Sequence, residues 1–261
     1  MKSFMNFEEN IAARPKYYGA CPFPHDYPFS NDYDPLSILK QCYKGGDSYG
    51  FIIAVGGLGN ALSLAHSRKE SFTICVDQNP NVTKVSTVTR EAILNSATPD
   101  KALKEIRTRF ETLFSSDERR GRMGLFPRDL EFDFACEIQS RSTTHWSYKD
   151  NYDCAREVCE TGAIAIVSAD IANTKFQTEL RKRAKIGNTA CSLLSMTNVH
   201  GYVPTRKALR NILRGLPLSR EVDILFSERP EQYCQVQPLT RGLEAYMQSV
   251  EDAVGSELLH I

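Results

Sequence analysis

The residues whose types and spacing most clearly suggest a ligand-binding site are glycines and an acid in the first third of the chain. Gly56, Gly57 and Gly59 follow an apolar run, and Asp77 ends the next apolar run. Glycines let a ligand approach the backbone closely, and a carboxylate can accept hydrogen bonds from both hydroxyls of a ribose. A dinucleotide site places such an acid about 20 residues after its glycine turn, and Asp77 stands at that distance from Gly57. A tight turn between two buried strands explains the same glycines equally well.

Further polar residues follow two later apolar runs. Asp170 ends the run that begins at Ala163. The run that begins at Ala190 ends in a polar group formed by Thr197, Asn198, His200 and Tyr202. In a doubly wound sheet, ligands bind outside the carboxyl ends of the strands, which is where all these residues fall. Together they predict a pocket, although each one taken singly has an alternative role as a helix cap or a surface residue.

His200 is the candidate general base of this pocket. It stands just after the fourth apolar run and its imidazole titrates near neutral pH, as a general base requires. Asn198 and Tyr202 complete the candidate catalytic group, where Tyr202 either orients a substrate or simply packs. A histidine in a loop that faces solvent is the alternative interpretation of His200.

The elements that must position these residues alternate along the chain. Strands are predicted for five apolar runs, at 49–55, 71–77, 163–171, 190–199 and 221–229. Helices are predicted between and around them, at 35–46, 60–68, 81–96, 99–114, 147–162, 174–187 and 204–216. This alternation predicts an α/β fold with a doubly wound, mainly parallel sheet and helices on both faces. The first strand is expected near the middle of the sheet.

One domain is expected over 1–261. An N-terminal arm and helix occupy 1–47, and the sheet core is formed by 48–80 and 161–230. The intervening 81–160 is a helical and irregular insertion after the second strand, longer than a simple crossover needs. We expect this insertion to form a lid over the substrate.

Aromatic residues gather near the end of that insertion. His145, Trp146, Tyr148 and Tyr152 stand within a short stretch. Such a cluster can stack on a flat acceptor or cover a cofactor, and with the N-terminal arm it would roof the pocket. The alternative is that it anchors the insertion onto the core.

Composition excludes several classes of function. Lys plus Arg and Asp plus Glu each number 32 in 261 residues, so no general attraction to nucleic acid is expected. No run approaches the ~20 apolar residues of a membrane span, and the N-terminus lacks the apolar core of a secretion signal. The eight cysteines are scattered without paired metal-ligand spacing, which favours reduced thiols in a cytoplasmic protein and no metal site.

The glycine turn also excludes specific chemistries. No lysine follows it, so the phosphate-binding loop of nucleoside triphosphatases is absent. Leu62 occupies the position of the third glycine in a dinucleotide fingerprint, which argues against NAD. No Gly-x-Ser-x-Gly elbow occurs, and we set hydrolysis aside.

The motifs IIAVGGLGN, VDQNP, VSADI and LSMTNV, in this order, resemble those of class I S-adenosyl-L-methionine (SAM)-dependent methyltransferases. The resemblance implies that the glycine turn passes beneath the methionine moiety, that Asp77 holds the ribose and that Asp170 contacts the adenine amino group. By the same resemblance, the expected cofactor-binding set is Val55, Gly56, Gly57, Gly59, Asn60, Asp77, Gln78, Asn79, Ala169, Asp170, Ile171 and Thr197.

A second likeness concerns the stretch after the second strand. Asp77, Asn79 and Pro80 form an Asp-x-Asn-Pro motif similar to that of the 3-amino-3-carboxypropyl transferases of betaine-lipid synthesis, and LSMTNV resembles poorly characterised bacterial relatives of that group. The chain departs from the methyltransferase pattern at Ala54 and Val55, where an acid usually binds the methionine amino group. No Asn/Asp-Pro-Pro-Tyr motif follows the fourth strand.

Three functions therefore remain open. The first is methyl transfer to a polar acceptor, either a small molecule or a protein. The second is transfer of the 3-amino-3-carboxypropyl group. The third is a non-catalytic binding or effector protein that keeps the fold, for which the missing acid would be natural.

Overall fold

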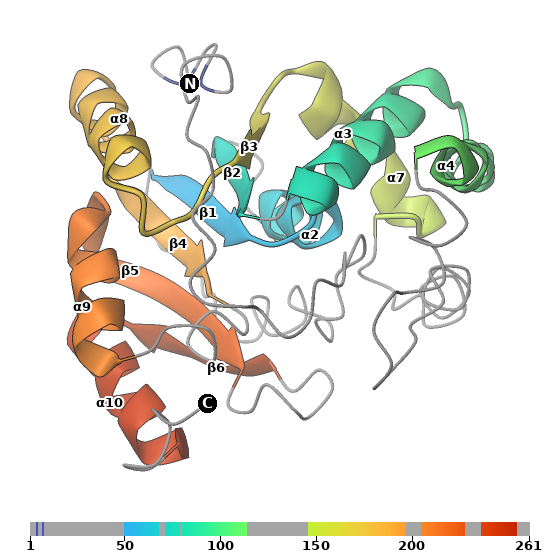
Figure 1. Ribbon diagram of the computed structural model, residues 1–261. Helices are drawn as coiled ribbons and strands as arrows, with labels where there is room; N and C mark the ends of the chain where they lie inside the picture. Colours follow the sequence, from blue (N-terminus) through green and yellow to red (C-terminus); the bar gives the residue numbers. More distant parts are fainter. Residues whose placement is uncertain are drawn as a thin grey trace.

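The computed structural model describes Phe4, Phe7 and residues 50–67, 71–78, 80–113, 146–196, 205–227 and 236–254. Predictions that concern other residues, including the helix at 35–46 and most of the N-terminal arm, lie outside this part of the chain. Figure 1 shows a central sheet with helices on both of its faces.

The sheet has six strands in the order β3-β2-β1-β4-β5-β6. These strands are β1 (Phe51–Val55), β2 (Thr73–Asp77), β3 (Ile164–Ser168), β4 (Cys191–Ser195), β5 (Leu218–Ser227) and β6 (Val236–Arg241). The first five are parallel, whereas β6 pairs with β5 in the antiparallel sense. The predicted α/β fold, its mainly parallel sheet and the inner position of the first strand are confirmed.

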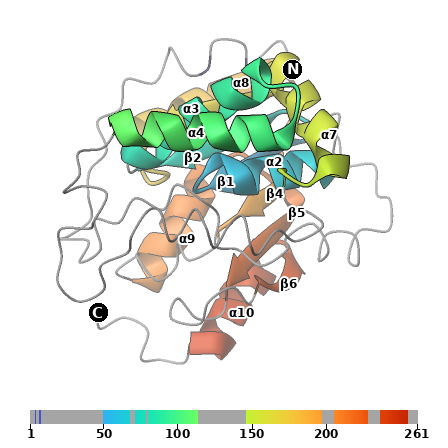
Figure 2. The same cartoon turned by 90° about the vertical axis from the view of Figure 1, so that its right-hand side faces the viewer.

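Helices cover both faces of the sheet (Figures 1 and 2). One face carries α2 (Leu58–Ser67), α3 (Pro80–Asn95), α4 (Pro99–Leu113) and α7 (Lys149–Glu160). The other face carries α8 (Thr174–Ile186), α9 (Arg206–Gly215) and α10 (Leu243–Val254). Side chains alternate between the two cores, so Ile52 and Ala54 of β1 face the first group and Ile53 faces the second. This double burial explains why each inner strand is a continuous apolar run.

Local sequence signals set several helix ends. Pro80 and Pro99 occupy the first positions of α3 and α4, where a missing amide proton costs no intrahelical hydrogen bond. The Asn173 side chain caps α8 by accepting from the amides of Lys175 and Phe176. Thr205 caps α9 in the same manner.

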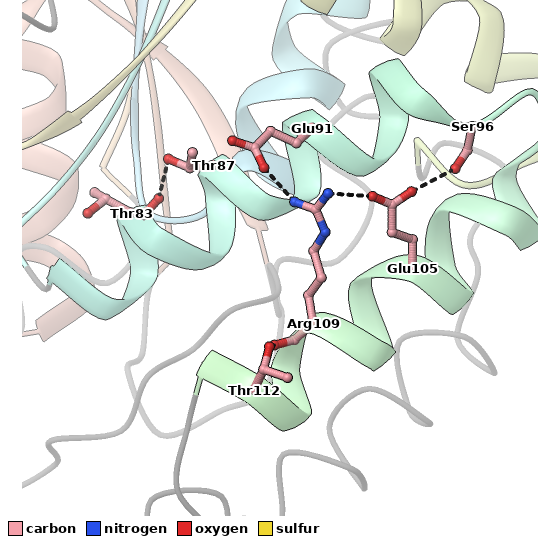
Figure 3. A network of polar contacts seen from close by, with 7 residues as sticks. All are labelled: Thr83, Thr87, Glu91, Ser96, Glu105, Arg109 and Thr112. Carbon is pink, nitrogen blue, oxygen red and sulfur yellow. Dashed lines mark hydrogen bonds and ion pairs between the residues drawn. The ribbon is translucent and has the colours of Figure 1, made fainter.

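The described parts of the crossover from β2 to β3 are mainly helical. Helix α3 packs against α2, α4, α7 and the strands β2 and β3, so it covers the sheet as the helix of a simple crossover would. Figure 3 shows how α4 is tied to α3: the Arg109 guanidinium contacts the Glu91 carboxylate at 2.5 Å and the Glu105 carboxylate at 2.7 Å. These side chains are partly exposed, so the network adds little to the stability of the fold.

Two phenylalanines of the N-terminal arm belong to the second core. Phe4 is 2% exposed and stacks on Phe72 with ring centres 5.0 Å apart. Phe7 is 1% exposed, contacts the Phe176 ring of α8 edge-on, and has the Arg183 guanidinium 5.3 Å from its ring centre. These residues stand far from β1 in sequence, yet Phe4 packs against its first residue, Phe51. The described part of the arm is thus a structural component of the sheet's second face.

The described cysteines Cys75, Cys154, Cys159 and Cys191 are buried and form no disulfide bond. Burial raises the pKa of the Cys159 thiol to about 12, which makes it a small apolar side chain rather than a nucleophile.

None of the helices in the described ranges is long and apolar enough to cross a bilayer.

Candidate functional site

The carboxyl ends of four strands form one edge of the sheet. The register pairs Ala54 with Ser195, Val55 with Val76, and Asp77 with Ser168. Neighbouring strands lie about 4.8 Å apart, so the residues that follow these pairs form a continuous row. The strand order reverses between β1 and β4, and this is the point at which doubly wound sheets bind ligands.

The glycine turn leaves β1 at this point of the edge. Gly56 has a φ of 115°, which disfavours every residue with a side chain, and its amide donates to the Val76 carbonyl at 3.0 Å. A Cβ atom built on Gly56 would meet no atom within 4 Å. The backbone is therefore held firmly beside open space, an arrangement that allows a ligand to lie against it.

The first turn of α2 follows the glycines and is tied to two other elements. The Leu58 amide donates to Ser86 Oγ of α3 at 3.1 Å. Asn60 Nδ2 donates to Ser195 Oγ at the end of β4, also at 3.1 Å. Gly57 and Gly59 are buried and their carbonyls accept bonds within α2, from the Ala61 amide and Ser63 Oγ. These contacts fix the N-terminus of α2 at the edge.

Asp77 and Gln78 lie at the same edge, one strand away. Both residues are half-buried, and Asp77 is the last residue of β2. The Asp77 carbonyl accepts from the Ala169 amide at 2.9 Å, which joins the end of β2 to the end of β3. Asp77 therefore stands one strand away from the glycine turn, where a ribose-binding acid is expected. Asn79 lies outside the described residues.

Asp170 follows β3 and is 6% exposed. Its Oδ1 accepts from the Ala172 amide at 2.8 Å within a local turn, while Asn173 supplies the cap of α8. Burial raises the pKa of the Asp170 carboxyl above its usual value, and the Ala172 hydrogen bond opposes that change. Its neighbours Ala169 and Ile171 are buried in the second core, and their packing fixes the backbone position of Asp170 between them.

The predicted acceptor side of the pocket falls on undescribed residues. Thr197, Asn198, His200 and Tyr202 all lie within 197–204, outside the described part. The last described residue before them is Met196, whose amide donates to the Leu225 carbonyl of β5 at 2.8 Å. Their roles stay predictions.

The aromatic residues near 146 anchor the helical layer. Trp146 and Tyr152 are each 2% exposed and belong to the first core with α2, α3 and α4. The Tyr152 hydroxyl donates to the carbonyls of Ile93 and Ser96 at the end of α3. For these two residues the anchoring alternative is correct and the roofing role is not. Tyr148 is exposed, and His145 lies outside the described residues.

A hollow beside Trp146 is too small for the predicted ligand. Its volume is about 10 Å³, room for about one water molecule, whereas sites for drug-sized molecules occupy about 300–1,000 Å³. Its lining residues are Leu62, Ser63, His66, Trp146, Asn151 and Ala155. The edge at the glycine turn therefore remains the candidate site. The described ranges hold no group of three His, Cys, Asp or Glu residues that could bind a metal.

Comparison with known proteins gives no family assignment. The chain matches no protein-family model and no curated protein.

The described residues of this edge bring candidate ligand-binding groups together. Gly56 borders open space, and the carboxylates of Asp77 and Asp170 follow two adjacent strands. Ser86 and Ser195 accept the hydrogen bonds that hold α2 at this edge, and neither residue was predicted to do so. The signal available for Ser195 was its place as a polar residue near the end of an apolar run. Ser86 stands in the middle of a helix and offers no such signal.

Proposed function

We propose that this protein is a SAM-dependent transferase that acts on a polar acceptor, with methyl transfer as the first candidate reaction. The observation that carries the proposal is the placement of Asp77 and Asp170 after adjacent strands, beside a glycine turn that borders open space at the switch point. A nucleoside on this edge would present its ribose hydroxyls to Asp77 and its base to Asp170. When bound, SAM supplies an electrophilic carbon on its sulfonium.

The residues that hold the cofactor do not by themselves select the transferred group. Binding and orientation supply much of the acceleration in a displacement of this kind, because two reactants are held in line. The acceptor would approach over 197–204, where Asn198, His200 and Tyr202 follow β4. The chain is proposed to act in the cytoplasm, on a small molecule or on an exposed polar group of a protein.

A double-label assay tests the proposal and separates the two transfer reactions. The protein is incubated with a cell lysate and with SAM labelled either in its methyl group or in its carboxyl carbon. Methyl transfer moves only the first label to an acceptor, and 3-amino-3-carboxypropyl transfer moves only the second. Binding of SAM without transfer of either label would instead support the non-catalytic binding or effector protein, a function to which the uncharged Ala54 and Val55 also lend support.

Replacement of Gly56 by alanine should weaken SAM binding by about tenfold or more, because the new methyl group enters the space proposed for the ligand. The positive φ should also cost about 1–2 kcal/mol of unfolding free energy. Gly162→Ala is the matched control: Gly162 also has a positive φ and open space around it, but it precedes β3 at the opposite edge. Calorimetry and denaturant unfolding measure the two effects, and equal SAM affinities for both variants would contradict the assignment.

Replacement of His200 by glutamine should lower the transfer rate by about 10²–10⁴-fold and leave SAM affinity nearly unchanged, since a general base contacts only the acceptor side. Turnover and calorimetric affinity are compared in the same preparation. An equal loss of both would assign His200 to the cofactor site or to the structure.

A further inference from the structure

The Asn60 side chain connects two elements across the switch point. It stands in the first turn of α2, is 3% exposed, and donates from Nδ2 to Ser195 Oγ at the end of β4. The backbone partner of Ser195 in the sheet is Ala54, one residue before the end of β1. The Asn60 amide group therefore lies between the start of α2 and the end of β4, beside the glycine turn.

One half of this amide has no partner. Asn60 Oδ1 is buried and accepts no hydrogen bond in the structure. Exchanging the oxygen and nitrogen positions would only leave a buried amino group in the same condition. Buried polar atoms without partners are rare and unfavourable, so an orphaned amide atom at a candidate site points to a group that a ligand supplies.

The surroundings favour a donor from the ligand as that group. Ala54 and Val55 end β1 without a charge, so no acid stands on this strand to receive a cationic group. The N-terminus of α2 attracts negative charge by its dipole, and it lies next to the same amide. A zwitterionic amino-acid tail matches both features, with its carboxylate toward the helix and its ammonium toward the amide oxygen.

We propose that Asn60 Oδ1 accepts a hydrogen bond from the ammonium group of the ligand's amino-acid end, with Ser195 holding the amide in that orientation. This inference rests on the proposed function, because it takes the ligand to be SAM or its product. Asn60 is then a specificity residue: it distinguishes a nucleoside with an amino-acid tail from the same nucleoside without one.

The test compares two ligands with a common nucleoside. S-adenosylhomocysteine carries the amino-acid tail, whereas 5′-methylthioadenosine lacks it. In calorimetric titrations, Asn60→Ala should lower the affinity for S-adenosylhomocysteine by about tenfold. Its affinity for 5′-methylthioadenosine should stay within about twofold of the wild-type value. Asn60→Asp keeps an acceptor oxygen and nearly the same shape, so its affinity for S-adenosylhomocysteine should stay within about threefold of the wild-type value. Ser96→Ala, a buried substitution just past the far end of α3, is the matched control and should alter neither affinity.

The outcomes separate this inference from the proposed function. If the wild type binds neither ligand, the proposed function fails. If it binds both and Asn60→Ala weakens both equally or neither, only the role of Asn60 is overturned. The inference would also be overturned if Asn60→Asp bound S-adenosylhomocysteine more weakly than Asn60→Ala does. That result would mean that the wild-type Asn60 amide donates to the carboxylate of the ligand and does not accept from its ammonium group. Thermal unfolding checks that each variant is folded, and Asn60→Asp carries the test if Asn60→Ala does not fold.

Discussion

Replacement of Phe7 by alanine lowers the free energy of unfolding by about 3–5 kcal/mol, the usual cost of removing a fully buried aromatic ring. Phe7 is 1% exposed and fills the space between the Phe176 ring and the Arg183 guanidinium. The loss removes the ring's apolar contacts, its edge-to-face contacts with other rings and its contact with the Arg183 guanidinium. Denaturant unfolding followed by circular dichroism measures the difference.

Tyr148→Ala is the matched control for Phe7. Tyr148 is an exposed aromatic residue at the start of α7, and only its backbone carbonyl is hydrogen-bonded to the helix. Its replacement should change the unfolding free energy by no more than about 0.5 kcal/mol. If Phe7→Ala is as stable as Tyr148→Ala, the N-terminal arm does not belong to the core in solution.

Replacement of Asp77 by alanine raises the dissociation constant for SAM by roughly 10–150-fold, equivalent to about 1.5–3 kcal/mol. A carboxylate that accepts from both ribose hydroxyls makes charge-assisted hydrogen bonds, and alanine cannot replace either one. Asp77 ends β2 at the edge that carries the glycine turn, so the effect is expected on the nucleoside part of the ligand. The 5′-methylthioadenosine affinity should therefore fall by the same factor.

Asp153→Ala provides the charge-matched comparison. Asp153 is an exposed carboxylate of α7, so its removal changes the net charge equally without touching the edge of the sheet. Its affinity for SAM should equal that of the wild type. Unchanged affinity in Asp77→Ala as well would mean that any cofactor binds elsewhere.

The sheet could be predicted from the sequence where its strands are buried on both faces. The five parallel strands are apolar runs, and the helices between them carry clear end signals such as Pro99 and Gly162. The sixth strand and α10 were not predicted. β6 reads VQPLTR and contains Pro238, which removes a ladder hydrogen bond and is tolerated at a sheet edge. Since β6 ends the described sheet, it needs no long apolar run.

The candidate site was only partly predictable for a related reason. The glycine turn, Asp77 and Asp170 stand at strand ends, and strand ends can be located from hydrophobic patterns. The bonds from Asn60 to Ser195 and from Leu58 to Ser86 join residues that are distant in sequence, so no local pattern reveals them. Trp146 could equally have covered a ligand or packed inside, and only the tertiary structure distinguishes these roles.

The central claim is that the edge at the glycine turn binds the nucleoside of SAM. Its most direct test is a calorimetric titration of the wild-type protein with S-adenosylhomocysteine, accompanied by the Asp77→Ala variant. We predict one binding site per chain in the wild type, with the affinity reduced by at least about tenfold in the variant. An absence of binding by the wild type at millimolar ligand, or equal affinities for the two proteins, would contradict the claim.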